Sequence, residues 1–241
     1  MKDDSKNEST GICCICGTFG KLTDEHIPPK ASGNNKPVRV QGHEHLFDKT
    51  SRKFGSTQKS NKGYVQKRLC SNCNSFFGSN YVQSFLGFSE EIKRQLIDGN
   101  PNHTGNKFRV QIRPLAIYKQ ILVMLTVVSN GQFDEPLKSQ IKNFLLEKRS
   151  MDKPEGLSIL LYNSLQIKPR FLGVHVISSP SGIQKCAQIV YPPFGFDMFL
   201  GEYPENSLKL NIDLFSTIDF DQEVDVEISL GIVNEKSVFG I

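Results

Sequence analysis

Apolar positions divide the chain into two parts of different texture. Residues 11–80 are rich in Cys, Gly, Ser, Asn and Lys and short of long apolar runs. Such a segment buries little apolar surface, so we expect it to need a stabilising cross-link such as a metal site or a disulfide. After it, apolar residues recur at helical spacing, and from residue 156 onward they fall in short runs separated by turn residues.

Two helical segments are predicted first. The stretch YVQSFLGFSEEIKRQLID, residues 81–98, has helical spacing of apolar residues and a break expected near Gly87. Residues 114–131 are apolar on most faces, with Pro114 suited to a first helical turn and Gly131 to a helix end. This second helix is therefore expected to be central and buried.

The remaining pattern predicts a third helix and then a sheet. Asp134 is expected to cap a helix over residues 134–149. Five strand-like segments follow, at residues 157–163, 170–178, 187–200, 208–216 and 224–233. The predicted fold class is α+β, in which helices pack on an antiparallel β-sheet.

The composition is that of a globular protein, and its 241 residues suffice for one large domain or two small ones. The start, MKDDSKNEST, lacks the apolar region of a signal peptide, and we interpret it as a disordered tail. No run approaches the roughly 18 apolar residues that span a bilayer. These features predict a cytoplasmic protein without membrane contact, whose cysteines are reduced thiols or metal ligands.

Positive charge is concentrated in the first half. Residues 1–113 contain 18 Lys and Arg against 10 Asp and Glu, whereas residues 114–241 contain 11 against 15. The basic half also contains the paired cysteines. This distribution indicates one part that meets a polyanion, the alternative being two solvated surfaces of unequal charge.

Two Cys-x-x-Cys pairs predict a structural zinc site. Each pair offers two thiolates, and two pairs complete a tetrahedral sulfur site. The predicted ligands are Cys13, Cys16, Cys70 and Cys73. Cys14 is an adjacent spare, and Cys186 is expected to be a core thiol. Four unrelated buried thiols and a redox dithiol are the alternatives.

Zinc at these cysteines would close the chain between the two pairs into a loop. KLTDEHIPP then leaves the first pair as a strand, YVQKRL enters the second pair as another, and SNCNSFFGSNYVQSF continues as a helix. The result is a predicted zinc-stapled ββα finger. Asp24, Glu25 and His26 lie on its first strand and Asn74 on its helix.

The combination of Cys-x-x-Cys, EHIPP and LCxxCN resembles the zinc-ribbon branch of the HNH, or ββα-metal, endonucleases. The resemblance covers residues 13–81, roughly a third of the chain. It implies an enzyme that hydrolyses phosphodiester bonds in DNA, and it permits a role in restriction or antiphage defence. The domains expected are a tail at 1–10, an HNH-like domain at 11–107 and a helix-plus-sheet domain at 108–241.

The resemblance also implies residue roles. His26 would be the general base, while Glu25 and Asn74 would bind a catalytic divalent ion. Hard oxygen donors of this kind suit Mg²⁺ or Mn²⁺. Neighbouring side chains of a strand point to opposite faces, so Glu25 and His26 share one site only if the strand end is irregular, for which Pro28 and Pro29 are suited.

One part of the family pattern is missing. The asparagine expected shortly before the second cysteine pair is absent from GYVQKRLC, and Gln66 is the candidate substitute, with Asn61 further back. This departure keeps open a non-catalytic zinc-ribbon module that binds nucleic acid or docks a partner. Asp24 is a second acidic candidate or a solvated turn residue.

A long basic insertion lies between the two cysteine pairs. Its basic residues alternate with Ser, Thr, Gly, Gln and Asn, a composition suited to phosphate contacts, with a solvated loop as the alternative. The predicted nucleic-acid-binding residues are Lys49, Arg52, Lys53, Lys59, Lys62, Lys67 and Arg68. His43 and His45 are candidate metal ligands or ordinary loop residues. A further alternative is that a protein partner or an activating signal acts through the second half of the chain, residues 108–241.

Overall fold

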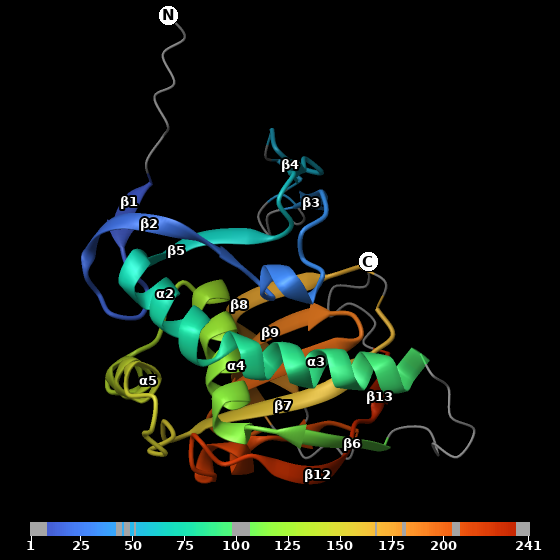
Figure 1. Ribbon diagram of the computed structural model, residues 1–241. Helices are drawn as coiled ribbons and strands as arrows, with labels where there is room; N and C mark the ends of the chain where they lie inside the picture. The colour runs from blue at the N-terminus through green and yellow to red at the C-terminus, as the bar shows by residue number, and fades with distance from the viewer. Residues whose placement is uncertain are drawn as a thin grey trace, which may run out of the picture.

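The computed structural model describes residues 9–41, 45, 49–50, 52–97, 107–166, 168–179, 182–203 and 208–234. These residues form helices α2 to α5 and four β-sheets (Figure 1). The mixed α+β class confirms the predicted fold class. Among the described residues, no helix is both long enough and apolar enough to cross a membrane.

A three-stranded antiparallel sheet and a helix form the N-terminal layer. They comprise β1 (Thr10–Ile12), β2 (Phe19–His26), β5 (Val65–Cys70) and α2 (Ser71–Asn80). Helix α2 begins directly after β5. Between β2 and β5, the short hairpin of β3 (Val38–Val40) and β4 (Gln58–Ser60) projects from the body of the molecule (Figure 1).

The second half contains the predicted antiparallel sheet. Its strands are β7 (Leu157–Ser164), β8 (Arg170–Ser179), β9 (Gly182–Tyr191), β10 (Phe194–Leu200), β11 (Leu210–Asn211) and β13 (Ile232–Val233). The order is β11-β7-β10-β9-β8, and β13 pairs with β7 in parallel. The prediction of a strand over residues 208–216 is mostly wrong. Only Leu210 and Asn211 form strand β11, and the 3-10 helix η2 (Asp213–Thr217) follows. There the Asp213 amide donates a hydrogen bond to the Asn211 side-chain oxygen, which favours a turn.

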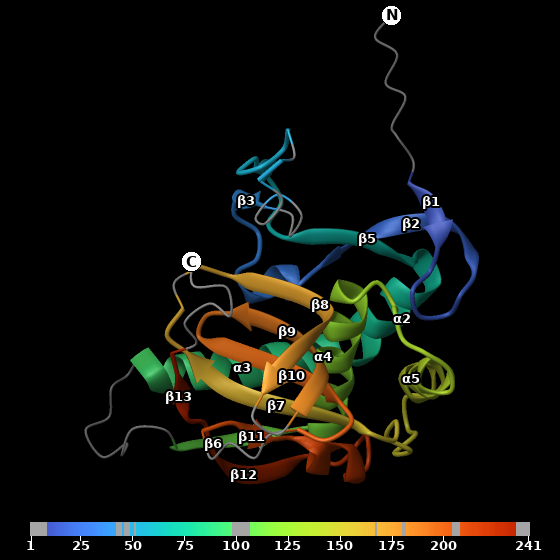
Figure 2. The ribbon, with the colours of Figure 1, turned by 180° about the vertical axis from the view of Figure 1, so that it is seen from behind.

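Helix α4 (Pro114–Val128) is the centre of the fold, as predicted. It lies between α3 (Val82–Ile97) and one face of the large sheet (Figure 2). All its residues from Pro114 to Val127 are buried. One hydrophobic core continues from the N-terminal layer through α4 to the large sheet, so the layer that contains the cysteines packs directly on the rest of the fold.

Two helix boundaries differ from the prediction. The chain turns at Tyr81, whose hydroxyl donates to the Leu145 carbonyl at 2.7 Å, and α3 continues through Gly87 without a break. Helix α5 (Leu137–Leu146) follows Pro136 and has no side-chain cap, so Asp134 is not its cap. The Asp134 carboxylate instead pairs with Lys185.

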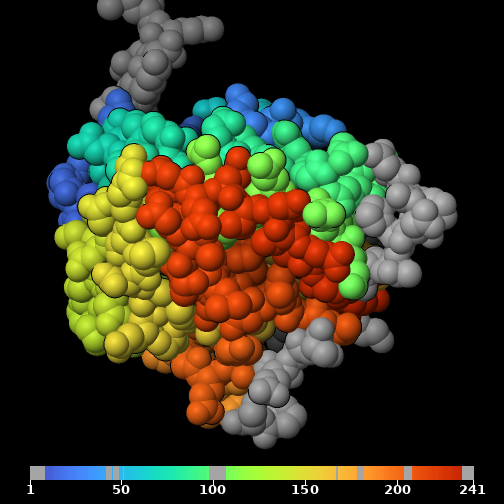
Figure 3. All heavy atoms as spheres, turned by 60° about the horizontal axis from the view of Figure 1, so that its bottom comes forward, coloured from blue at the N-terminus to red at the C-terminus, as the bar shows by residue number. Residues whose placement is uncertain are grey.

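The sequence interpretation placed the predicted strand over residues 224–233 in the large sheet, and it missed the partner of that strand. Strand β6 (Lys107–Ile112) pairs with β12 (Val224–Ser229) at the face seen in Figure 3, where green residues lie beside red ones. Its outward side chains form cross-strand ion pairs, such as Arg109 with Asp225 at 3.2 Å. The alternation of polar and apolar residues in KFRVQI is a strand pattern that the sequence interpretation missed, and only the pairing itself depends on a partner more than 100 residues away.

Candidate functional site

The four predicted cysteine ligands lie together. Their sulfur atoms are all within 4.8 Å of one another, and Cys16 Sγ is 3.7 Å from Cys70 Sγ. A tetrahedral zinc site with Zn–S bonds of about 2.3 Å places its sulfurs about 3.8 Å apart. The cluster therefore fits a metal ion such as zinc. It joins the turn before β2 to the end of β5 and the first turn of α2.

Hydrogen bonding within the cluster favours a thiolate. The bond from Cys73 is the main cause that lowers the pKa of Cys13 to about 4, and the same contact raises the pKa of Cys73. A metal cation can replace the shared protons of such a cluster. Cys14 is outside it: its amide donates to the Arg68 carbonyl, and burial raises the pKa of its thiol to about 12.

His26 lies at the end of β2, half-buried, and its ring is fixed by one hydrogen bond. Nε2 is 3.0 Å from the backbone carbonyl of Lys62. Because a carbonyl only accepts, Nε2 must have the proton, which leaves Nδ1 as the acceptor of the neutral ring. No second partner of the ring is present in the described part of the chain. The geometry thus presents a basic nitrogen with a defined tautomer.

Asn34 holds the chain around His26, and the sequence interpretation missed it. Its side chain is 1% exposed, and Nδ2 donates to the carbonyls of Pro28 and Tyr64, each at 2.9 Å. The Tyr64 amide donates to Asn34 Oδ1 at 2.7 Å. Gly63 has φ +86, and a Cβ there would lie 2.4 Å from the Asn34 carbonyl. This amide therefore ties the segment after β2 to the segment before β5.

Glu25 is a buried carboxylate, with 9% of the residue exposed. Within the described residues it has no hydrogen bond and no ion pair, and burial raises its pKa to about 7. It lies opposite Gln66, whose amide donates to the Tyr64 hydroxyl at 2.8 Å rather than to His26. The Tyr64 ring stacks on Phe171 of β8 at 3.8 Å, so this face of β2 is turned towards the large sheet.

Asn74 is bound to the same stretch of β2. Its Nδ2 donates to Thr23 Oγ1 at 2.9 Å and to the Asp24 carbonyl at 3.1 Å, which leaves Oδ1 out of both bonds. The pairing of β2 with β5 shifts register between Thr23 and Asp24, at this contact. Asn74 is therefore fixed to β2 at an irregular step, whereas Glu25 and His26 follow in the regular part of the strand and leave opposite faces.

Asp24 is a strand residue rather than a turn residue. Its carboxylate pairs with the Lys62 ammonium at 3.0 Å, with both groups open to solvent. An exposed pair of this kind contributes little to stability. Of the two candidate histidine ligands of the insertion, His45 is buried and bonded to Ser56 Oγ at 3.2 Å, and His43 lies outside the described residues.

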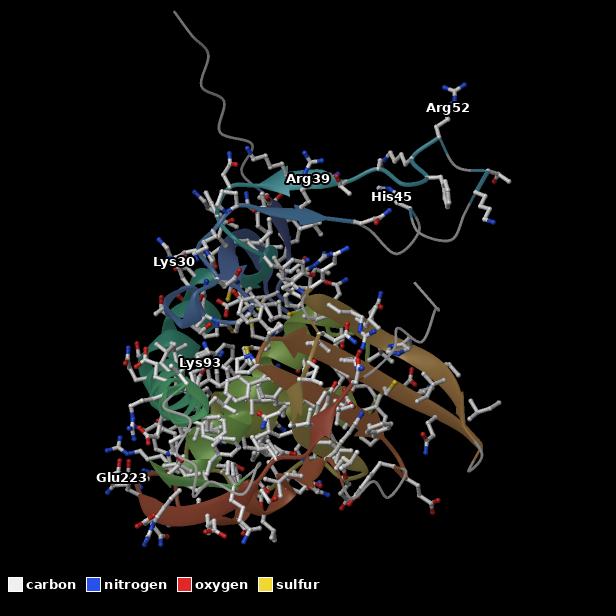
Figure 4. All side chains as sticks on the ribbon, turned by 90° about the vertical axis from the view of Figure 1, so that its right-hand side faces the viewer. Lys30, Arg39, His45, Arg52, Lys93 and Glu223 are labelled. Atoms are coloured by element: carbon white, nitrogen blue, oxygen red, sulfur yellow. The ribbon has the colours of Figure 1, made fainter. Side chains whose placement is uncertain are left out.

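The predicted nucleic-acid-binding residues surround the strand ends and continue along the β3–β4 arm. All are exposed except the half-buried Arg68. Figure 4 shows Arg52 at the outer end of the arm and Glu223 at the opposite end of the molecule. The basic side of the molecule thus includes the end of β2 that contains His26.

A scan of protein-family models, a search of curated proteins and a search of solved structures each found no match to the chain. The site is therefore interpreted from its own geometry. That geometry consists of a four-thiol cluster, a histidine of defined tautomer and a buried carboxylate that precedes it in the same strand.

Proposed function

We propose that the chain is a metal-dependent nuclease of the HNH type, which hydrolyses phosphodiester bonds in DNA. The observation that carries the proposal is the hydrogen bond from His26 Nε2 to the Lys62 carbonyl. It orients the ring and keeps Nδ1 unprotonated in the neutral form, as a general base requires. Nδ1 would take the proton of the water that attacks phosphorus.

The isolation of the Glu25 carboxylate supports a cation site beside the base. A buried carboxylate without a partner is costly, and a cation would remove that cost. Carboxylate and amide oxygens are hard donors, so Glu25 and Asn74 Oδ1 would hold Mg²⁺ or Mn²⁺. When bound, the ion supplies charge neutralisation on the phosphate and the leaving oxygen.

The strand alternation restricts where the phosphate can lie. Glu25 and His26 leave opposite faces of β2, so a phosphate reaches both only around the end of the strand, where β2 stops at His26. Asn34 fixes that end through the Pro28 and Tyr64 backbones. Nearby Lys62 and Lys67 are exposed and can contact flanking phosphates.

Cleavage of supercoiled plasmid and of single-stranded DNA tests the proposal. Zinc-loaded protein is assayed with Mg²⁺, Mn²⁺ or chelator, beside His26→Ala and the matched pair Glu25→Gln and Asp24→Asn. We expect metal-dependent cutting that falls at least about 100-fold in His26→Ala and Glu25→Gln, and that persists in Asp24→Asn. Undiminished cutting by His26→Ala would contradict the assignment of the base.

A second candidate is a zinc-ribbon module that binds nucleic acid without cutting it. The placement of Glu25 and His26 on opposite faces of β2 favours it. Its signature is binding of DNA that weakens steeply with salt and is unchanged in His26→Ala, with no cutting by wild-type protein in either metal. Charge reversal of Lys62 and Lys67 would then reduce the salt dependence.

A further inference from the structure

A second histidine is also fixed by a backbone carbonyl, on the large sheet. His175 of β8 lies directly opposite Cys186 of β9 in the strand register. Its Nε2 is 3.3 Å from Cys186 Sγ, and its Nδ1 is 2.8 Å from the Gly173 carbonyl. A register shift between Leu172 and His175 bends β8 beside this contact.

The carbonyl again defines the tautomer. The Gly173 carbonyl can only accept a hydrogen bond, so Nδ1 of the neutral His175 ring has the proton and Nε2 is the acceptor. The Cys186 thiol must therefore donate to Nε2. A nucleophile, a base within hydrogen-bond distance and a third group that orients the base form the arrangement that activates nucleophiles in proteins.

We propose that Cys186 is a reactive thiol that is oxidised by small hydroperoxides, with His175 as its base. His175 takes the thiol proton, and the thiolate sulfur attacks one peroxide oxygen. The S–O bond forms as the O–O bond breaks, and the departing alkoxide or hydroxide takes the proton from His175. The sulfur is oxidised to a sulfenic acid and the peroxide is reduced to an alcohol or water. This proposal is independent of the proposed nuclease.

The other cysteines differ from Cys186 in their surroundings. Four belong to the four-cysteine cluster, which fits a metal ion. Cys14 packs in the main core, and no imidazole lies within hydrogen-bond distance of it among the described residues. Cys186 therefore combines a thiol outside the cluster with an adjacent base.

The surroundings of Cys186 restrict the reagent by size. It packs with Leu160 and Phe199, and with the partly buried Tyr203, and is 6% exposed. Because so little of the thiol is exposed, the proposal is restricted to a small oxidant such as a peroxide. Beyond Gln188 on the same strand face lies the buried pair of Asp197 and Lys209.

The groups that face the thiol bear on its pH dependence. Among the residues that the structure describes, the titratable groups that contact it are His175 from β8 and Tyr203 from the segment after β10. Asp197 and Lys209 form an ion pair with each other, so their charges largely cancel at Cys186. The described group in hydrogen-bond contact with the thiol is therefore the His175 imidazole.

The test is site-resolved oxidation of the full-length, zinc-loaded protein by hydrogen peroxide in the presence of a sulfenic-acid trap. Peptide mass spectrometry gives the labelling rate of Cys186, and Cys14 in the same molecule is the internal reference. We expect Cys186 to be labelled at least about 10-fold faster than Cys14 at pH 7. Equal or slower labelling of Cys186 would overturn the proposal, and this comparison needs no variant.

His175→Gln then tests the base, since glutamine has an amide but cannot take the thiol proton. We expect the Cys186 rate to fall at least about 10-fold and its pH profile to shift upward, while the Cys14 rate is unchanged. A Cys186 rate and pH profile that do not change in a folded His175→Gln protein would show that the contact is an ordinary structural hydrogen bond.

Discussion

The sheet of β1, β2 and β5 and the sheet of β7 to β10 are stabilised by different means. Strand β2 buries only Leu22 and Glu25, and its layer is joined through four cysteines. Strand β7 is buried along almost its whole length between β11 and β10 of the large sheet. A layer whose strands are joined by a metal site would need few apolar positions, which would leave its strand ends to polar groups.

The largest expected effect separates these two layers. Cys73→Ser removes one of the four thiols, so bound zinc should fall from one per chain to nearly none. We expect the N-terminal layer to lose on the order of 5–10 kcal/mol, below the affinity of isolated zinc fingers because the common core supports it. Zinc analysis and limited proteolysis check this, with cleavage expected before residue 81.

Cys186→Ser is the matched control, because it removes a buried thiol from the other sheet. It should leave the zinc content unchanged. Equal protease resistance of Cys73→Ser and wild-type protein would refute the metal-dependent stability of the N-terminal layer.

A second prediction concerns Asn34. Asn34→Ala removes three hydrogen bonds to the backbone and leaves the Pro28 carbonyl and the Tyr64 amide without this partner, while the Tyr64 carbonyl keeps the Ile27 amide, so the free energy of unfolding should fall by about 3 kcal/mol. The neighbouring Asn35 is exposed, and Asn35→Ala should change the free energy of unfolding by less than about 0.5 kcal/mol. Urea unfolding measures both, and similar losses in the two variants would argue against a positioning role for Asn34.

The C-terminal part contains a buried charge of its own. Lys119 is fully buried in α4, and its ammonium donates to the Phe144, Glu147 and Lys148 carbonyls at the end of α5. Burial lowers its pKa from 10.5 to about 7. Between those values the unfolded chain binds more protons than the folded one, so the free energy of unfolding rises with pH.

Comparison with a neutral side chain isolates this contribution. From pH 7 to pH 9, wild-type protein should gain about 2 kcal/mol relative to Lys119→Met. The exposed Lys142 of α5 provides the control, and Lys142→Met should follow the wild-type pH profile. Parallel profiles of wild-type and Lys119→Met protein would exclude the lowered pKa.

The smallest effect distinguishes the two acids of β2. The folded pKa of Glu25 is about 7 against an ordinary 4.5, so the folded state binds more protons in that window and stability falls as pH rises through it. At pH 8 without divalent ions, Glu25→Gln should be more stable than wild type by about 1–2 kcal/mol. Asp24→Asn should be neutral or slightly destabilising, and a destabilised Glu25→Gln would contradict an isolated carboxylate.

The sequence predicted features that depend on local spacing. The two cysteine pairs, the buried helix from Pro114 and most strands of the large sheet are in this class. The sequence interpretation missed the alternating pattern of β6, while the pairing of β6 with β12 and the turn at Tyr81 depend on remote partners that local spacing does not show. Asn34 was hidden because it lies in a stretch rich in polar residues, and only burial distinguishes it from Asn35.

Chemical rescue tests most directly the central claim that His26 is a base held by the Lys62 carbonyl. Plasmid cleavage by His26→Ala and by Glu25→Gln is measured under single-turnover conditions with and without added imidazole. We predict that imidazole raises the cleavage rate of His26→Ala at least about 10-fold and leaves the rate of Glu25→Gln unchanged. Cleavage by His26→Ala at the wild-type rate, with no response to imidazole, would contradict the account.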